Sequence, residues 1–269
     1  MQNRNFDNGR QMSNFIVQIF LVMRQNLITI FRRPEAVIPP IGISLFFLLI
    51  YDSTLGKAAG FIPDLGGNDY LGFILPLSIV SSSLSGSGIA AQNLVRNIEN
   101  GYFDKLLLTP IYRFSLLTGT IMAGGVILAL QAAVVVGTGL LLGLESATGI
   151  PGLITVIGLA MLLGLGFAGF TMSAALGSGN AAATQSASFV FFPLTFLAPT
   201  FVPLDLLDGW LKTLAQINPI TYVLEAMRAL LNVGWDEIVL LEGFLATVLL
   251  GGAMYVLTLL ALGWRTRRA

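Results

Sequence analysis

The chain consists of long hydrophobic runs separated by short polar, glycine-rich or proline-containing stretches. A helix needs roughly 20 mostly apolar residues to cross a bilayer, and the runs accommodate six such helices. We therefore predict an all-α integral membrane fold in which 1–269 form a single transmembrane domain. The predicted spans lie at about 36–52, 70–92, 114–144, 151–176, 187–202 and 238–263.

One boundary in this assignment depends on a single polar stretch. No charged residue occurs between Glu145 and Asp205, and this interval is too long for one span. The sequence GSGNAAATQS at 177–186 is rich in residues that favour loops, so we predict a turn there. The order of the later spans across the membrane depends on this turn.

The segment before the first span has a different pattern, because polar residues recur on one side of a helix over 13–33. This pattern is typical of a helix that lies in the membrane interface, and Pro34 ends it. The residues before it lack a small-residue cleavage pattern, so we expect no cleaved signal peptide. The polar stripe consists of Gln18, Gln25, Thr29 and Arg32.

Composition and charge support a membrane protein. Only 10% of the residues are charged and the mean hydropathy is +0.82, whereas about a quarter of a soluble domain is charged. The 14 Lys and Arg balance the 14 Asp and Glu, so bulk charge indicates no nucleic-acid partner. The basic residues gather on one side of the predicted topology: Arg4, Arg10, Arg24, Arg32, Arg33, Arg96, Lys105, Arg113, Arg265, Arg267 and Arg268. The positive-inside rule then places both termini in the cytoplasm of a multi-pass cell-membrane protein.

The loop at 93–113, on the same predicted cytoplasmic side, contains the charged block RNIENGYFDKLLLTPIYR. Gly101 permits a turn, the next residues can form one or two helical turns, and Pro110 ends them. Such an element either docks a partner protein or anchors the loop in the membrane interface through its aromatic residues. The candidate residues are Glu99, Asn100, Gly101, Tyr102, Phe103, Asp104, Lys105, Leu107 and Pro110.

Residues 204–235 have the pattern of two short amphipathic helices before the last span. Asn218 is a favourable N-cap and Pro219 suits the first helical position, so we predict the boundary between the two helices there. Glu225 and Arg228 form either a local ion pair or a contact that holds these helices at an outer gate. The candidate motif consists of Asn218, Pro219, Tyr222, Glu225 and Arg228.

A few polar and aromatic residues inside the predicted spans are candidates for lining a transport pathway. Serines also allow membrane helices to pack closely, and phenylalanines commonly face lipid or the core, so these structural roles are the commoner explanation. Gln131 is a lone amide within its span and is expected to seek a hydrogen-bond partner on another helix. The candidate pathway residues are Ser82, Ser85, Gln131, Phe189 and Phe192.

The residues that are absent exclude several kinds of chemistry. The chain has no cysteine and no histidine, which excludes disulfides, thiol nucleophiles, imidazole bases and most zinc sites. We predict no catalytic residue, no metal site and no cofactor in this chain. The phosphate-binding motif G-x-x-x-x-G-K-[ST] is also absent, so ATP hydrolysis would require another polypeptide.

Taken together, the segment before the first span, IENGYFDKLLLTPIYR with LLTGTIMAGG, and INPITYVLEAMRALL resemble the membrane subunit of an ABC type-2 exporter. The resemblance covers essentially the whole chain and is closest to permeases of the daunorubicin-resistance group. It implies a cytoplasmic coupling helix that docks on an ATP-binding subunit carrying ATP and Mg, and a re-entrant helical hairpin before the last span. The residues that match the coupling region are Glu99, Gly101, Asp104, Lys105 and Pro110.

Three classes of function therefore compete. The leading hypothesis is the permease subunit of an ATP-driven exporter, which forms the pathway with a second copy or a close relative. Its uncharged spans suit an amphipathic drug, a lipid or a glycolipid. A secondary transporter or channel would usually need charged groups at membrane depth, and an intramembrane enzyme would need an unusual Ser/Lys arrangement. The span centres contain none of these charged groups.

Overall fold

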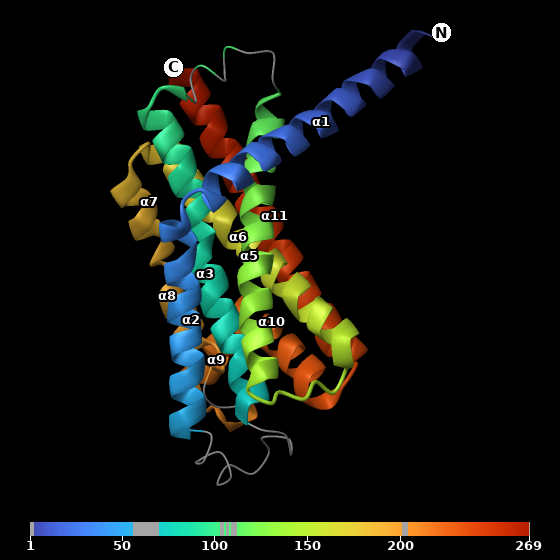
Figure 1. Ribbon diagram of the computed structural model, residues 1–269, viewed down its shortest axis with the longest axis vertical. Coiled ribbons are helices and arrows are strands. Elements are labelled where there is room, and N and C mark those ends of the chain that lie inside the picture. Colours follow the sequence, from blue (N-terminus) through green and yellow to red (C-terminus); the bar gives the residue numbers. More distant parts are fainter. Residues whose placement is uncertain are drawn as a thin grey trace.

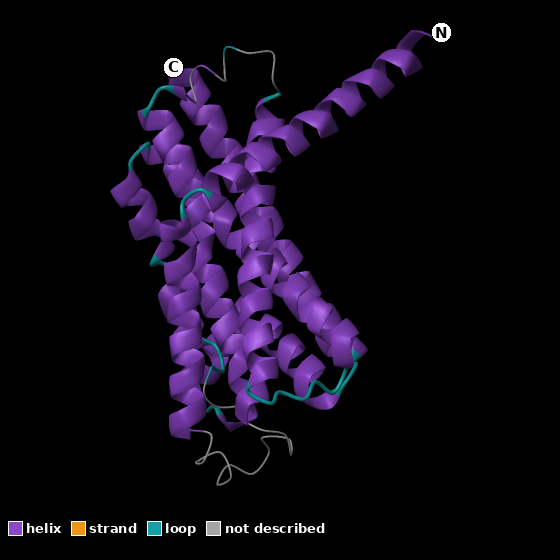
Figure 2. Cartoon of the chain, viewed as in Figure 1, coloured by secondary structure: helices purple, strands orange, loops and turns teal. Residues whose placement is uncertain are grey.

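The computed structural model describes residues 3–55, 70–102, 105, 108, 112–200 and 204–268, and within these ranges it contains helices and no strand. The prediction of an all-α fold is confirmed (Figure 2). The helices are α1 (Asn3–Phe31), α2 (Pro34–Leu55), α3 (Tyr70–Glu99), α5 (Arg113–Leu141), α6 (Gly149–Ser178), α7 (Ala181–Ser188), α8 (Phe191–Leu197), η2 (Leu204–Leu206), α9 (Gly209–Ile217), α10 (Pro219–Arg228), η3 (Ala229–Val233) and α11 (Glu237–Arg268).

Four of these helices, α3, α5, α6 and α11, are long and apolar enough to cross a membrane. The apolar stretches Val37–Ser53 in α2 and Ala181–Leu197 across α7 and α8 are shorter. Length and composition therefore agree with a membrane protein. The count of six spans stays a prediction, because it depends on how the two shorter stretches sit in the bilayer.

The long helices form a bundle, from one end of which α1 projects (Figure 1). Both termini, the end of α3 and the start of α5 lie at this end, whereas α9, α10 and the connection between α5 and α6 lie at the opposite end. Close packing of α6 on α11 holds the bundle together, since a Cβ added to Gly166 would stand 3.4 Å from the Cα of Gly251. Small residues commonly permit such close approach of membrane helices.

The fifth apolar run differs from the prediction of one span at about 187–202. It forms two short helices, because α7 ends at Ser188, α8 begins at Phe191, and the chain becomes extended at Ala198 with φ −79° and ψ 161°. Helix α7 also includes most of the polar stretch predicted as a turn. The reason is the Asn180 side chain, which accepts hydrogen bonds from the backbone N–H groups of Ala182 and Ala183 and caps the helix.

The turn before α7 is therefore only two residues long. Gly179 has φ +59°, the left-handed conformation that glycine adopts readily at the end of a helix. This residue ends α6, and Asn180 begins α7 directly after it. The position of the reversal was correctly predicted, and its length was overestimated.

The predicted division at Asn218 and Pro219 is confirmed. The Asn218 side chain accepts a hydrogen bond from the Ile220 N–H at 3.0 Å, and Pro219 occupies the first turn of α10. Helix α10 continues into the wide π-helical turn η3, which Gly234 ends with φ +137°. This geometry packs η3 and α10 against the bundle, with Val223, Leu224, Leu230 and Leu231 buried in the core.

Candidate functional site

A groove of about 450 Å³ runs along one side of the bundle between α2, α3, α7 and α8. Its walls are mostly aromatic and hydroxyl side chains, including Phe47, Tyr51, Ser81, Phe192 and Phe196. Glu35 is the one charged side chain among the described residues that line it. Grooves of this size and character suit ligands of the size of a drug.

The phenylalanines reach the groove because α8 is fixed to α6 by its opposite side. The buried ring of Phe191 lies 4.2 Å from the Phe167 ring and 4.9 Å from the Phe170 ring, measured between centroids. The side chains of Phe189 and Phe192 then face outward and are 65% and 59% exposed. The groove is therefore an open apolar face of the single chain.

The end of the groove nearest the termini is polar. Gln92, near the end of α3, donates from Nε2 to Oε1 of Gln185 on α7 at 2.5 Å. Glu35 in the first turn of α2 lines the same groove. An amphipathic molecule in this groove would find apolar walls along its length and polar groups at this end.

The structure brings together three of the five predicted pathway residues, since Ser85, Phe189 and Phe192 all line the groove. Ser82 does not line it and is fully buried. The reason is helical spacing, because the groove stripe of α3 follows steps of three and four residues and Ser82 lies one position away from it. The stripe consists of Ser78, Ser81, Ser85, Ile89 and Gln92.

Gln131 also lies away from the groove. It is fully buried and packs over Gly86 of α3, where an added Cβ would collide with its Oε1. Within the described part of the chain, neither Oε1 nor Nε2 has a hydrogen-bond partner. The hydrogen bond to another helix that we predicted for this amide is therefore not formed.

Sequence reasoning missed several groove residues that share one signal. Ser78, Ser81 and Gln92 continue the stripe that contains Ser85. Gln185 lies on α7, just before Phe189, and Phe196 lies on α8 with Phe192. The spacing of three and four residues along α3 is visible in the sequence. Which helices face this stripe is not visible there, because that depends on the packing of the bundle.

Arg228 joins three elements at the far end of the groove. Its Nε donates to the Phe73 carbonyl at 3.2 Å, Nη1 to the Pro199 carbonyl at 2.7 Å and Nη2 to the Thr200 carbonyl at 3.0 Å. The side chain is only 8% exposed. Because Thr200 lines the groove, Arg228 connects α10 directly to the groove wall as well as to the start of α3.

The other residues of this motif shape the α9–α10 hairpin. Asn218 donates from Nδ2 to the Leu194 carbonyl of α8 at 2.5 Å, and the Tyr222 hydroxyl donates to the Gln216 carbonyl of α9 at 2.7 Å. Glu225 is half-buried on α10. The hairpin is thus attached to α8 and α3, while its role as an outer gate stays a prediction.

The described members of the predicted coupling set lie at the end of α3 or directly after it, and α3 ends where both termini lie (Figure 1). Glu99 is the last residue of α3, Gly101 has φ +67°, and Asn100, Tyr102 and Lys105 are exposed. The Tyr102 hydroxyl accepts a hydrogen bond from Nε2 of Gln25 on α1 at 2.8 Å. Four residues of the predicted set lie outside the described residues: Phe103, Asp104, Leu107 and Pro110.

The described residues contain no group of three or more Asp and Glu side chains that could hold a metal ion. The features that remain are the groove, the hairpin held by Arg228, and the exposed residues Asn100, Tyr102 and Lys105 after α3. The groove combines apolar walls with a polar end, which suits an amphipathic molecule.

The chain is similar to known transport permeases. The model of the ABC-2 type transporter family matches residues 17–232. A transport permease named ycf38 from Cyanophora paradoxa is 29% identical over 80% of this chain and 74% of its own length. The doxorubicin resistance ABC transporter permease protein DrrC of Mycobacterium tuberculosis is 26% identical over 80% of this chain and 76% of its own length. The daunorubicin resistance permease DrrB1 of Streptomyces coeruleorubidus is 26% identical over 74% and 69%, respectively. The chain belongs to the ABC-2 type transporter family and is a membrane permease of this class.

Proposed function

We propose that this chain is the permease subunit of an ATP-driven exporter, and that the groove between α2, α3, α7 and α8 is half of its pathway. The observation that carries the proposal is the groove itself, an open apolar face in a chain of this family. Phe189 and Phe192 are more than half exposed on it. A second copy of the chain, or a close relative, facing this side would enclose the groove.

The energy source in this proposal is a separate ATP-binding subunit that carries ATP and Mg. The chain has no phosphate-binding loop of its own. The exposed residues Asn100, Tyr102 and Lys105 come after α3 at the end of the bundle that holds both termini, which we predict to be cytoplasmic. Closure of the ATP-binding subunits would pull on this connection and favour one of two states of the permease.

The substrate proposed from the groove lining is an amphipathic drug, a lipid or a glycolipid. Aromatic and aliphatic walls bind an apolar body, while serine hydroxyls and the Gln92–Gln185 pair offer hydrogen bonds at defined places. The relatives whose names refer to doxorubicin and daunorubicin support the drug class.

Reconstituted vesicles containing this chain and its copurifying ATP-binding subunit test the groove. We expect Ser85→Trp to block uptake of a fluorescent amphipathic dye, because Ser85 is exposed in the groove and an indole there would obstruct it. Val248→Trp is the matched control, since Val248 is also exposed but lies on α11, away from the groove. Equal transport by both variants would exclude the groove as the pathway, and transport without ATP would favour a secondary transporter.

Docking of the ATP-binding subunit has a test of its own. Phe103→Asp would place an unpaired charge in an apolar partner groove, which costs several kcal/mol and is enough to prevent copurification. Val233→Asp is the control, because Val233 is exposed in η3, which continues α10, and α10 lies at the opposite end of the bundle. Copurification of the Phe103 variant at the wild-type level would show that the connection after α3 is not the docking element.

A further inference from the structure

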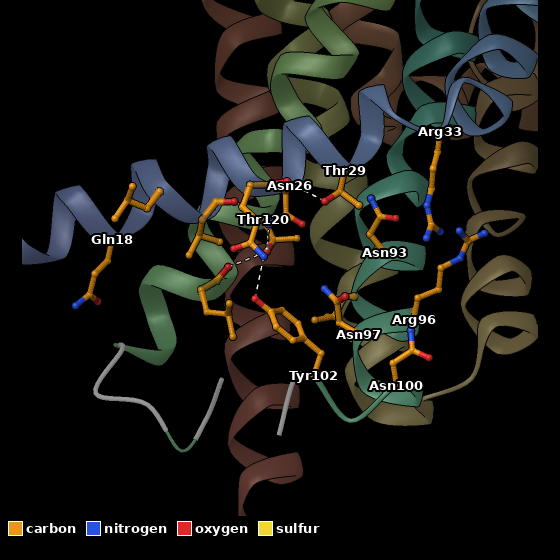
Figure 3. Close-up of a pocket in the computed structure, with 15 residues that line it drawn as sticks. Gln18, Asn26, Thr29, Arg33, Asn93, Arg96, Asn97, Asn100, Tyr102 and Thr120 are labelled. Atoms are coloured by element: carbon orange, nitrogen blue, oxygen red, sulfur yellow. Dashed lines mark hydrogen bonds between the residues drawn. The ribbon is translucent and has the colours of Figure 1, made fainter. Parts of the chain in front are cut away.

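A second pocket, of about 290 Å³, lies between α1, α3 and α5 at the end of the bundle that holds the termini (Figure 3). It is separate from the transport groove, with which it shares no lining residue. Its lining contains an unusual number of amide side chains for so apolar a protein, including Gln18, Asn93, Asn97 and Asn100. None of the functions proposed above assigns a ligand to this pocket, although Asn100 and Tyr102 in its lining also belong to the predicted coupling set.

Two arginines give the pocket its charge. Arg33 follows α1 and Arg96 lies in the last turn of α3, and Figure 3 shows their side chains pointing toward each other. The described residues that line the pocket include no carboxylate, since neither Glu35 nor Glu99 is among them. Two facing guanidinium groups repel each other unless an anion lies between them. The pocket is therefore suited to an anion that both can bind with charge-assisted hydrogen bonds.

An unpartnered amide faces the same space. Asn93 is only 9% exposed, lines the pocket, and has no hydrogen bond from its side chain to any residue in the described ranges. Buried polar groups are nearly always hydrogen-bonded, so a ligand or water is expected at this amide. By contrast, Asn26 already donates to the Val22 carbonyl at 2.9 Å, and Gln25 donates to Tyr102, which fixes the pocket wall.

An apolar part of α1 lies beside the pocket. The neighbouring part of α1 exposes large apolar side chains, with Ile16 at 61%, Val17 at 52% and Phe20 at 58%. A helix of this kind lies at the level of lipid headgroups. Leu21, Leu94 and Leu116 line the pocket beside its polar groups. A headgroup in the pocket would thus leave its acyl chains beside an apolar surface.

We propose that this pocket binds the phosphate group of an anionic phospholipid, held between Arg33 and Arg96 with Asn93 as a further donor. Basic pockets between membrane helices on the cytoplasmic side have the chemistry that binds such headgroups. The bound lipid would tie α1 to α3 and would hold the Gln25–Tyr102 contact next to the connection after α3. The proposal requires only that this end of the bundle lies at a membrane surface, and it does not depend on ATP-driven export.

Native mass spectrometry of the purified full-length chain can measure this binding. With phosphatidylglycerol as the probe, we expect one tightly retained lipid, and Arg33→Gln with Arg96→Gln should weaken its binding by about tenfold or more. The matched control is Arg24→Gln with Arg32→Gln, because these two arginines are exposed near the same pocket but do not line it. This control removes the same net charge and should retain the lipid.

Three outcomes would overturn the proposal. One is equal retention of phosphatidylglycerol by the pocket variant and the control. Another is equal retention of the zwitterionic phosphatidylcholine by the wild-type chain. The third is displacement of the lipid by millimolar inorganic phosphate, which would indicate a site for free phosphate. Asn93→Leu is a second variant that leaves both charges in place and should also weaken binding. Lipid binding is measured without the ATP-binding subunit, so failure of the export proposal would leave this result unchanged.

Discussion

Arg228 on α10 lies with its guanidinium carbon 3.7 Å from the centre of the Phe73 ring, while its Nε also donates to the Phe73 carbonyl at 3.2 Å. One side chain therefore binds both the ring and the backbone of the same residue at the start of α3. The cation–π contact adds to the hydrogen bonds because both are shielded from water.

We expect Arg228→Ala to destabilise the protein by about 3 kcal/mol, because buried carbonyl oxygens lose charged donors and a ring loses its cation. Arg228→Lys should recover only part of this, since an ammonium group cannot reach the carbonyls of Phe73, Pro199 and Thr200 in the same planar geometry. Thermal unfolding in detergent measures both effects. Lys212→Ala on α9 is the control, and an Arg228→Ala variant as stable as this control would contradict the assignment.

The Asn218 side chain both caps α10 and donates a hydrogen bond to α8, and one substitution can remove the second contact while keeping the first. Asp is as good an N-cap as Asn, so Asn218→Asp keeps the acceptor for the Ile220 N–H. It removes the donor to the Leu194 carbonyl and places a carboxylate beside that oxygen. We expect this variant to lose about 2 kcal/mol of stability, measured by thermal unfolding. Asn180→Asp is the matched control, because Asn180 is exposed and its cap uses only the acceptor oxygen. If both Asp variants are equally stable, the contact with α8 contributes nothing.

Local signals in the sequence predicted the helices near Asn218 well. A capping side chain followed by proline marks a boundary whatever the surrounding fold is, and α10 begins at Pro219 as predicted. The same capping residue occurs at Asn180 without a proline, inside a stretch rich in glycine and serine. The glycine and serine residues there led to the prediction of a turn, and helix α7, which Asn180 caps, was missed.

The sites depend on packing, which the sequence shows only in part. Ser82 and Ser85 are the same residue type in the same serine-rich stretch, yet only Ser85 lines the groove. The assignment of Ser85 followed from its position in a predicted span, whereas the burial of Ser82 depends on which side of α3 meets the other helices. The phosphate pocket was not predicted because Arg33, Arg96 and Thr120 come from three separate segments.

We expect that the buried amide of Gln131 can be replaced by an apolar group without loss of stability. Both of its polar atoms lack a partner within the described residues, and it packs over Gly86. Methionine has nearly the same shape and carries no group that burial would penalise. We expect Gln131→Met to raise the stability by about 1 kcal/mol, seen as a higher midpoint of thermal unfolding. Gln92→Met is the comparison, because Gln92 is hydrogen-bonded to Gln185 and should lose stability. A clear decrease for Gln131→Met would reveal a polar partner, such as a buried water.

Two glycines on α11 should respond in opposite ways to the same substitution. A Cβ added to Gly243 would stand 2.5 Å from the Ala226 Cβ and 2.9 Å from the Tyr222 carbonyl oxygen, both on α10. Gly243→Ala therefore has to push the hairpin away from α11, and we expect it to cost about 2 kcal/mol. Gly252 has no atom within 4 Å of the same position, so Gly252→Ala should be neutral or stabilise the helix by about 0.5 kcal/mol. Thermal unfolding of the two variants in the same detergent compares them directly.

Gly243 contacts Tyr222 and Ala226 of α10, the helix that carries Glu225. A transport defect confined to the Gly243 variant would therefore also support a role for the hairpin in gating. Equal stability of the two variants would mean that α10 and α11 do not pack as closely as the structure describes.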